Sequence, residues 1–445
     1  MTTKPLAQAT IIGGGLAGCE AAWQLAKRGC PVRIYEMKPE KYSPAHQSEK
    51  LAELVCSNSF RSDDPHSAVG LLKNEMRTLN SLIMQIADET AVPAGKALAV
   101  DRAHFAEKIS EIIGQHPLIE LVRKEITEIP VPADCPIILA SGPLTSTALA
   151  ASLTRLTGKE RCFFYDAIAP IINADSLDRA IIYQKSRYDD GPGDYLNCPM
   201  EKEDYLSFIN ELASAQYVPL HDFEDVNYFE GCLPIEVIRS RGDDTLRFGP
   251  MKPVGLENPA TGRIPYAVVQ LRKENRQGSL YNMVGFQTKL TYGEQKRIFR
   301  TIPGLKNATF ARFGSIHRNT FICAPELLLP TLQTKARTDL FIAGQLSGVE
   351  GYVESTAMGL LAGINAACLM KSKQPYVFPQ ETAIGALIFH LTRTDASHFQ
   401  PSNINFGLFP PWNKKVPKKI RGKIRAEQSN STMNRMVSEL NLDTL

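Results

Sequence analysis

The chain has 445 residues, of which 43% are hydrophobic, and its formal net charge is only +3. This length allows one large core or two smaller ones, and the near-neutral charge excludes a strongly basic, dedicated nucleic-acid binder. The 9 cysteines are scattered, with no zinc-like spacing, so we expect reduced thiols and no metal site. The short polar N-terminus and the lack of a membrane-length apolar run predict a soluble, cytoplasmic protein without a membrane span.

A βαβ unit opens the sequence. Residues 9–12 are a short apolar strand, a glycine-rich turn leads into a helix over 19–28, and residues 32–36 are a second strand. The spacing Gly13-x-Gly15-x-x-Gly18 is typical of a turn that brings backbone and a helix N-terminus to a pyrophosphate, and Glu36 can accept bonds from ribose hydroxyls. The predicted cofactor-binding residues here are Gly13, Gly14, Gly15, Leu16, Ala17, Gly18 and Glu36.

Two later segments extend this unit into a sheet. Residues 136–143 form an apolar strand that runs into a small-residue turn, and residues 340–345 form another before an Ala/Gly-rich helix over 354–369. The glycine turn alone fits FAD, NAD or S-adenosylmethionine. A second turn at Gly344 and Gln345 suits the flavin end of an extended dinucleotide and favours FAD, because a purely nicotinamide-binding enzyme would not need it.

The predicted fold class is α/β, with a discontinuous, doubly wound, Rossmann-like FAD-binding domain that carries an inserted, smaller α/β domain. The composition shifts toward Tyr, Pro and Asp between the FAD-binding segments. The predicted boundaries are 1–160 and 311–411 for the FAD-binding domain, 161–310 for the inserted substrate- and RNA-interacting domain, and 412–445 for a basic C-terminal tail. The last fifteen or so residues are expected to be frayed.

Two cysteines stand out from the packing set by their neighbours. Cys56 is followed by polar residues and Arg61, and Cys232 precedes Leu-Pro-Ile-Glu and Arg239. A reactive thiolate needs partial exposure and a cationic or dipolar environment, which these arginines can supply. For a single cysteine, packing in a core is the more common role.

Long motifs show a family resemblance that spans residues 11–411. The turn at Gly13–Gly18, the Cys56–Arg61 segment, the Gly231–Pro253 region, residues 314–321 and residues 343–355 resemble the folate- and FAD-dependent tRNA (uracil-5-)-methyltransferase family, TrmFO. The MnmG family of wobble-uridine-modifying flavoproteins is the alternative; its chains are longer and carry a C-terminal helical domain for a partner GTPase. A non-catalytic flavin-binding RNA chaperone or redox sensor is a third hypothesis.

The resemblance implies formation of 5-methyluridine at the T-loop uridine, position 54, of tRNA, or the same chemistry on ribosomal RNA. A thiolate adds to uracil C6, the activated C5 takes the one-carbon unit of methylenetetrahydrofolate, and reduced FAD, reloaded by NAD(P)H, supplies reducing equivalents. Cys56 and Cys232 are carried over as catalytic, with the attacking thiol left open. His317, Arg318, Tyr352 and Glu354 are carried over as folate-binding, and the alternative for His317 is a structural histidine.

RNA is the predicted macromolecular partner, and no obligatory protein partner is predicted. A stacked uridine must be extruded to reach the flavin, so basic residues must hold the flanking phosphates. A solvated surface is the common role for such charge clusters. The candidates for RNA binding are Arg239, Arg241, Arg247, Lys252, Lys418 and Lys419.

Overall fold

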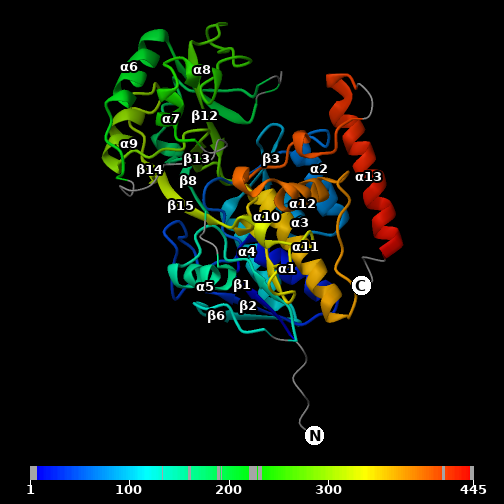
Figure 1. Ribbon diagram of the computed structural model, residues 1–445. Helices are drawn as coiled ribbons and strands as arrows, with labels where there is room; N and C mark the ends of the chain where they lie inside the picture. Colours follow the sequence, from blue (N-terminus) through cyan, green and yellow to red (C-terminus); the bar gives the residue numbers. More distant parts are fainter. Residues whose placement is uncertain are drawn as a thin grey trace.

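The computed structural model describes residues 8–132, 134–158, 162–187, 191, 193–219, 228, 233–412 and 416–440. These residues build two hydrophobic cores, which we call the first and second core (Figure 1). The first contains the glycine turn and residues from both ends of the chain. The second draws on residues 172–308 and forms the upper-left lobe of Figure 1.

A five-stranded parallel sheet lies at the centre of the first core. Its strands are β1 (Ala9–Ile12), β2 (Val32–Glu36), β6 (Ile119–Arg123), β7 (Ile137–Leu139) and β16 (Leu340–Ile342). They lie in the order β16-β7-β1-β2-β6, which is the Rossmann order 3-2-1-4-5 when the strands are numbered along the chain. This confirms the predicted fold class. The order reverses between β1 and β7, where ligands of such sheets bind.

Two helices cross closely above this sheet. Helix α1 (Leu16–Lys27) begins three residues before the predicted start, directly after Gly15, and helix α11 (Tyr352–Met370) begins two residues early, after Gly351. A Cβ atom on Gly359 would lie 2.2 Å from the carbonyl oxygen of Ala17. Small residues therefore set the crossing distance and hold α11 beside the N-terminus of α1.

Helix α11 is long and apolar enough to cross a membrane, but 89% of its most apolar window is buried inside the fold. It packs against α1 as a core helix (Figure 1). Its apolar composition therefore reflects burial in the protein core.

The other elements of the first core surround the sheet. They are α2 (Ala68–Thr78), α3 (Leu82–Glu89), α4 (Arg102–Gln115), α5 (Thr147–Thr157), α10 (Ala324–Leu327), α12 (Ala383–Arg393) and α13 (Arg421–Leu440), with the small sheet β3 (Ser59–Ser62), β5 (Ala97–Val100) and β4 (Ala91–Val92). The expectation of frayed residues at the end of the chain is wrong up to Leu440, because α13 packs on α2. The buried carboxyl of Glu75 accepts bonds from the N–H of Ala383 (2.6 Å) and from Ser429, so it joins α2, α12 and α13.

The second core is built on a six-stranded antiparallel sheet. Its order is β10 (Tyr183–Gln184), β11 (Tyr195–Met200), β12 (Ala267–Lys273), β13 (Leu280–Met283), β9 (Ile171–Asn173) and β14 (Phe310–Arg312). It is accompanied by α6 (Lys202–Ala213), α7 (Ile235–Ser240), α8 (Thr245–Phe248) and α9 (Tyr292–Phe299). The antiparallel pair β8 (Cys162–Ile168) and β15 (Ser315–Phe321) runs between the cores. The boundaries at 160, 310 and 411 stay predictions.

Candidate active site

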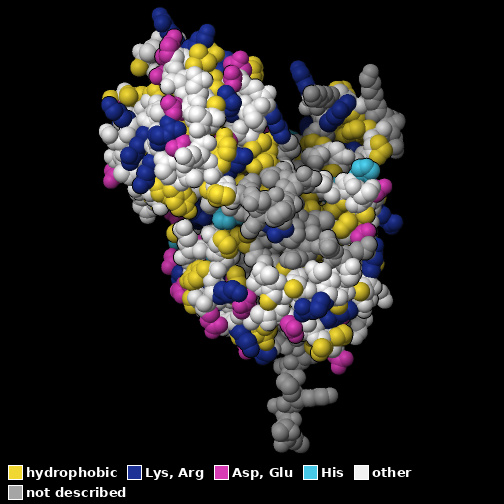
Figure 2. Space-filling model, turned by 60° about the vertical axis from the view of Figure 1, so that its left-hand side comes forward, with side chains coloured by type: hydrophobic (Ala, Val, Ile, Leu, Met, Phe, Trp, Pro, Cys, Tyr) yellow, Lys and Arg dark blue, Asp and Glu magenta, His cyan; other side chains and the backbone are white. Residues whose placement is uncertain are grey.

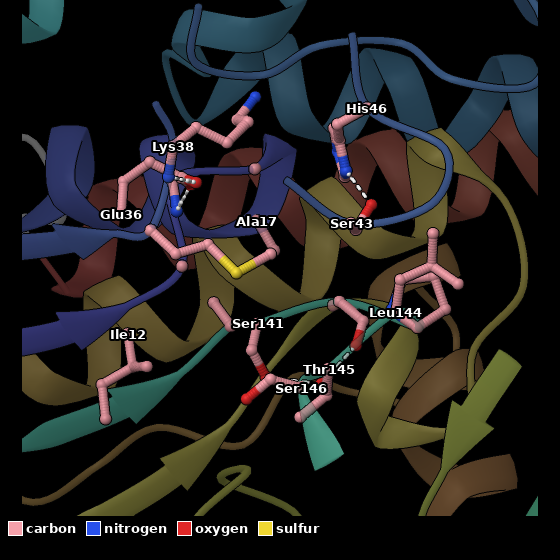
Figure 3. A pocket seen from close by; sticks show the side chains of 18 of the residues that line it. Ile12, Ala17, Glu36, Lys38, Ser43, His46, Ser141, Leu144, Thr145 and Ser146 are labelled. Atoms are coloured by element: carbon pink, nitrogen blue, oxygen red, sulfur yellow. Dashed lines mark hydrogen bonds between the residues drawn. The ribbon is translucent and has the colours of Figure 1, made fainter. Parts of the chain in front are cut away.

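A cavity opens where the order of the parallel sheet reverses. It is lined by the glycine turn after β1, by residues 140–146 after β7, and by Gly344 and Gln345 after β16. Figure 3 shows Ser141, Thr145 and Ser146 on one side of it and Glu36 on the other. Its empty volume of about 1130 Å³ includes solvent at its mouth, so the fit to a dinucleotide rests on the residues that line it.

The glycine turn leaves room for a pyrophosphate. Around a Cβ atom built on Gly15 there is no atom within 4 Å, whereas one on Gly13 would lie 2.4 Å from the oxygen of Ala140. Helix α1 has no acidic residue in its first turn and no side-chain cap, so its first N–H groups are available to an anionic ligand. Gly18 lies outside the lining and lets α1 pack on Gly13.

Glu36 ends β2 at the rim of this cavity. Its carboxylate accepts the N–H of Gly14 (2.8 Å) and the N–H of Lys38 (3.0 Å). A carboxylate has about four lone-pair sites, so it retains acceptor capacity for ribose hydroxyls. The glycine turn, Glu36 and the Gly344 turn thus fit the two ends of FAD.

A second cavity adjoins the first. Both are lined by Val55, Pro143, Leu144, Gln345 and Tyr352. The second is also lined by Arg272, Asn282 and Gln287 from the second core, so it lies between the two cores. A dinucleotide in the first cavity would therefore present one end to whatever enters the second.

Cys56 lines this second cavity and is half-buried. Its N–H and that of Ser57 donate to the hydroxyl of Tyr352, at 2.8 Å and 3.2 Å. Burial, followed by the nearby carboxylate of Asp166, raises the pKa of the Cys56 thiol to about 12. The thiol is therefore protonated at neutral pH.

The segment after Cys56 is bonded to both cores. Arg272 donates to Ser57 Oγ (2.8 Å) and to Asn58 Oδ1 (3.0 Å), and Asn58 Nδ2 donates to the oxygen of Lys273 (2.9 Å). Arg61, which has a positive φ of 61°, forms an ion pair with the buried carboxylate of Glu354. These contacts fix the backbone on which the thiol stands.

The four predicted folate-binding residues separate into two groups. His317 and Tyr352 line the second cavity, whereas Arg318 and Glu354 line neither cavity described above. Glu354 is fully buried and accepts the N–H of Ile404 (2.9 Å). Its ion pair with Arg61 therefore holds that side chain in place. Burial, with Arg312 and His46 nearby, lowers the pKa of His317 to about 4, so the imidazole is neutral at pH 7.

The predicted RNA-binding residues are spread over both cores. Arg239 pairs with Asp243 (3.0 Å), and Arg247 lies 3.5 Å from the ring centroid of Tyr266 and bonds to its oxygen. Arg241 caps α7, Lys252 follows α8, and Lys419 lines a separate surface cavity beside α13. All of Cys232 and the side chain of Lys418 lie outside the described residues.

Sequence reasoning missed several polar residues that line the second cavity, among them Asp166, Asn282 and Glu350. Burial and the nearby carboxylate of Asp166 raise the pKa of Glu350 well above its usual value. Asn282 is 3% exposed, and its Nδ2 has no hydrogen-bond partner among the described residues. Glu350 follows the predicted Gly344 turn, which was an available signal; no local pattern marks Asp166 or Asn282.

Comparisons with known proteins identify the relatives. The family model described as glucose inhibited division protein A matches residues 8–374. The chain is 68% identical over 419 residues to the methylenetetrahydrofolate--tRNA-(uracil-5-)-methyltransferase TrmFO of Desulfotalea psychrophila, covering 94% of each chain. It is 58% identical to the protein of the same name from Geobacter sulfurreducens, covering 94% of this chain and 96% of that one.

Solved structures show the same fold at low identity. Two crystal forms of Aquifex aeolicus GidA match with TM-scores of 0.68 and 0.72 at 17% and 16% identity, covering 99% of this chain and 74% and 76% of theirs. The MnmG-type alternative is not favoured, because the curated relatives at much higher identity carry the other name. The chain belongs to the glucose inhibited division protein A family and, within it, to the methylenetetrahydrofolate--tRNA-(uracil-5-)-methyltransferases TrmFO.

Proposed function

We infer that this protein forms 5-methyluridine in tRNA, with the one-carbon unit taken from methylenetetrahydrofolate, FAD as cofactor and NAD(P)H as reductant. The names of its relatives support the reaction. The observation that carries it is the position of the Cys56 thiol in a cavity that adjoins the dinucleotide cavity and shares Tyr352 and Gln345 with it. When bound, FAD supplies the reducing equivalents that convert the transferred methylene group to methyl.

The reaction requires a nucleophile and a proton acceptor. A thiolate bonds to C6 of uracil, and the electron pair moves toward C5, which then bonds to the folate methylene carbon after one of the two C–N bonds of that carbon has opened. A base takes the C5 proton as the remaining folate nitrogen leaves, which gives a methylene group on C5. Two reducing equivalents convert this methylene to methyl as the thiolate leaves C6, and the C5–C6 double bond is restored. Two groups with different proton affinities are needed, because the nucleophile must be ionised when the acid–base group is not.

We assign the acid–base role to Cys56 and the attack on C6 to Cys232. The Cys56 thiol is protonated at neutral pH, which disfavours a resting nucleophile and means that Cys56 must give up its own proton before it takes the one from C5. The carboxylate of Asp166 lines the same cavity and can accept the proton that the Cys56 thiol gives up. Cys232 remains the candidate nucleophile from its sequence motif.

Folate and uridine would share the second cavity. The neutral imidazole of His317 offers a flat ring and a neutral hydrogen-bonding nitrogen, with Ser315 Oγ 2.9 Å from its Nε2. Tyr352 lies between this cavity and the first. A pterin between the flavin and His317 would be within reach of both, so we keep these two residues as folate-binding. Glu354 acts instead through its ion pair with Arg61, and folate binding by Arg318 stays a prediction.

Position 54 of the T-loop, a cytoplasmic location and independence from a protein partner are parts of this proposal. The basic residues named above would hold the phosphates beside an extruded uridine. Arg239 and Arg247 already have acidic partners, so we expect smaller contributions from them than from Lys252 and Lys419.

Transfer of label from serine-derived methylenetetrahydrofolate to tRNA tests the function. We expect incorporation with NAD(P)H and without S-adenosylmethionine, at the T-loop uridine. Incorporation only into the wobble position, or only with S-adenosylmethionine, would refute the proposal.

Fluorouracil-containing tRNA tests the thiol roles. Cys232→Ser is expected to abolish the covalent adduct, whereas Cys56→Ser still forms it and stalls the later proton transfer. Loss of the adduct in Cys56→Ser alone would reverse the assignment, and its retention in both variants would exclude both thiols as the nucleophile.

A further inference from the structure

A column of aromatic rings runs outward from the second core and ends in solvent. Phe299 is buried, and Phe310 lies against it with 6.4 Å between centroids. Phe313 stacks on Phe310 at 5.1 Å and 24°, and Tyr292 stacks on Phe313 at 4.8 Å and 19°. Tyr292 is 57% exposed. An exposed ring at the end of an ordered stack is available to a further planar group.

Positive charge accompanies this column. The ammonium of Lys296 lies 5.4 Å from the centroid of Phe313. The ion pairs found among the described residues include none with Lys296, whereas the next residue, Arg297, is paired with Glu211 and Glu294. Figure 2 shows Lys and Arg side chains mixed with hydrophobic ones over this lobe. Aromatic rings beside unpaired cations are what single-stranded nucleic acid binds.

The column is fixed to the strand that carries His317. Gln295 of α9 donates to the oxygen of Gly314 (2.9 Å) and accepts its N–H (2.8 Å). Phe313 precedes His317 by four residues, so their Cα atoms are at most about 14 Å apart. Tyr292 stacks on Phe313 and therefore lies near the cavity that would receive the uridine. A short stretch of RNA could reach from this ring to the cavity.

We propose that Tyr292, Phe313 and Lys296 form a stacking platform for an unpaired base that flanks the target uridine. This rests on the proposed function, because it assigns a surface to the same RNA substrate. Extruding one base from a loop breaks its stacking with its neighbours, at a cost of a few kcal/mol. A ring that receives a neighbouring base offsets part of that loss and sets which nucleotide enters the cavity.

Binding of a fluorescently labelled tRNA T-arm hairpin, measured over a range of salt concentrations, tests the platform. Tyr292→Ala is expected to weaken binding about 5- to 150-fold without changing the salt slope, because stacking neutralises no phosphate. Tyr292→Phe and Tyr292→Trp should bind like the wild type. Lys296→Met should instead reduce the slope by about 1.

The matched control is Phe389→Ala, which removes another exposed aromatic residue, 46% exposed, from α12 of the first core. FAD content and NAD(P)H oxidation should be unchanged in every variant. Unchanged affinity in Tyr292→Ala, or an equal loss in Phe389→Ala, would overturn the platform while leaving methylation by the wild type intact. A wild-type protein that neither binds nor methylates tRNA would overturn the proposed function itself. An altered oligomeric state of Tyr292→Ala with unchanged RNA affinity would assign the column to a protein contact and also overturn the proposal.

Discussion

Replacing Tyr352, which lines both cavities, by Phe tests whether its hydroxyl holds the Cys56 segment in place. The hydroxyl accepts the N–H groups of Cys56 and Ser57, and no other acceptor for them is found among the described residues. A buried N–H that loses its acceptor costs about 1–3 kcal/mol. Water from the cavity can reach this half-buried position, so we expect the lower limit, a loss of about 1 kcal/mol in the free energy of unfolding.

The same substitution should change the thiol. The hydrogen bond of the Tyr352 hydroxyl lowers the pKa of Cys56, against the larger effect of burial, so its removal raises that pKa further. Alkylation of Cys56 at a fixed, mildly alkaline pH, followed by mass spectrometry of the peptide, should therefore become slower.

Tyr183→Phe is the matched control, because its hydroxyl donates to the backbone oxygen of Leu256 (2.6 Å) in the lobe of the second core and not to the Cys56 segment. It should leave the alkylation rate of Cys56 unchanged. If urea denaturation and alkylation of Tyr352→Phe both match the wild type, the hydroxyl does not hold the Cys56 segment and the reasoning fails.

Three further substitutions address the cofactor cavity and the packing around it. Gly15→Ala should fold normally but bind FAD about tenfold more weakly, measured by flavin titration of the apoprotein, because its methyl group enters open cavity space. Gly359→Val should lose FAD on desalting and about 1–3 kcal/mol of stability, because its side chain collides with Ala17; retained flavin would contradict the close crossing. Burial raises the pKa of Glu75 to about 7, so its protonated form stabilises the fold below about pH 4.5, and this contribution, about 3 kcal/mol, is lost as the pH rises through 7. Glu75→Gln should remove that dependence, so its unfolding free energy relative to wild type rises between pH 5 and 8; a constant difference would contradict the assignment.

The sheet and the cofactor turn were predictable because their signals are local. Residues 9–36 carry a strand, a glycine turn, a helix and a second strand within one short stretch, and each element fits its own sequence. The second cavity was harder to predict, since Cys56, Asn282 and Tyr352 meet only through tertiary packing.

The periodicity of strands and helices explains why only two of the four predicted folate-binding residues line the second cavity. Successive residues of a strand point to opposite faces, so His317 and Arg318 on β15 cannot both face one cavity. Residues two apart on a helix differ by about 200°, so Tyr352 and Glu354 of α11 face different sides. The two motifs, residues 314–321 and 343–355, show which residues are close in sequence. They do not show which way each side chain points, so all four residues were predicted to bind folate.

The bonds that tie residues 56–58 to both cores make this segment a mechanical link. A rotation of the second core must break the bonds from Arg272 to Ser57 and Asn58 or pull the segment along. The hydroxyl of Tyr352 holds the other side of the same segment to the first core. A change in the angle between the two cores would therefore strain these bonds, so the segment that carries the thiol couples the cofactor cavity mechanically to the second core.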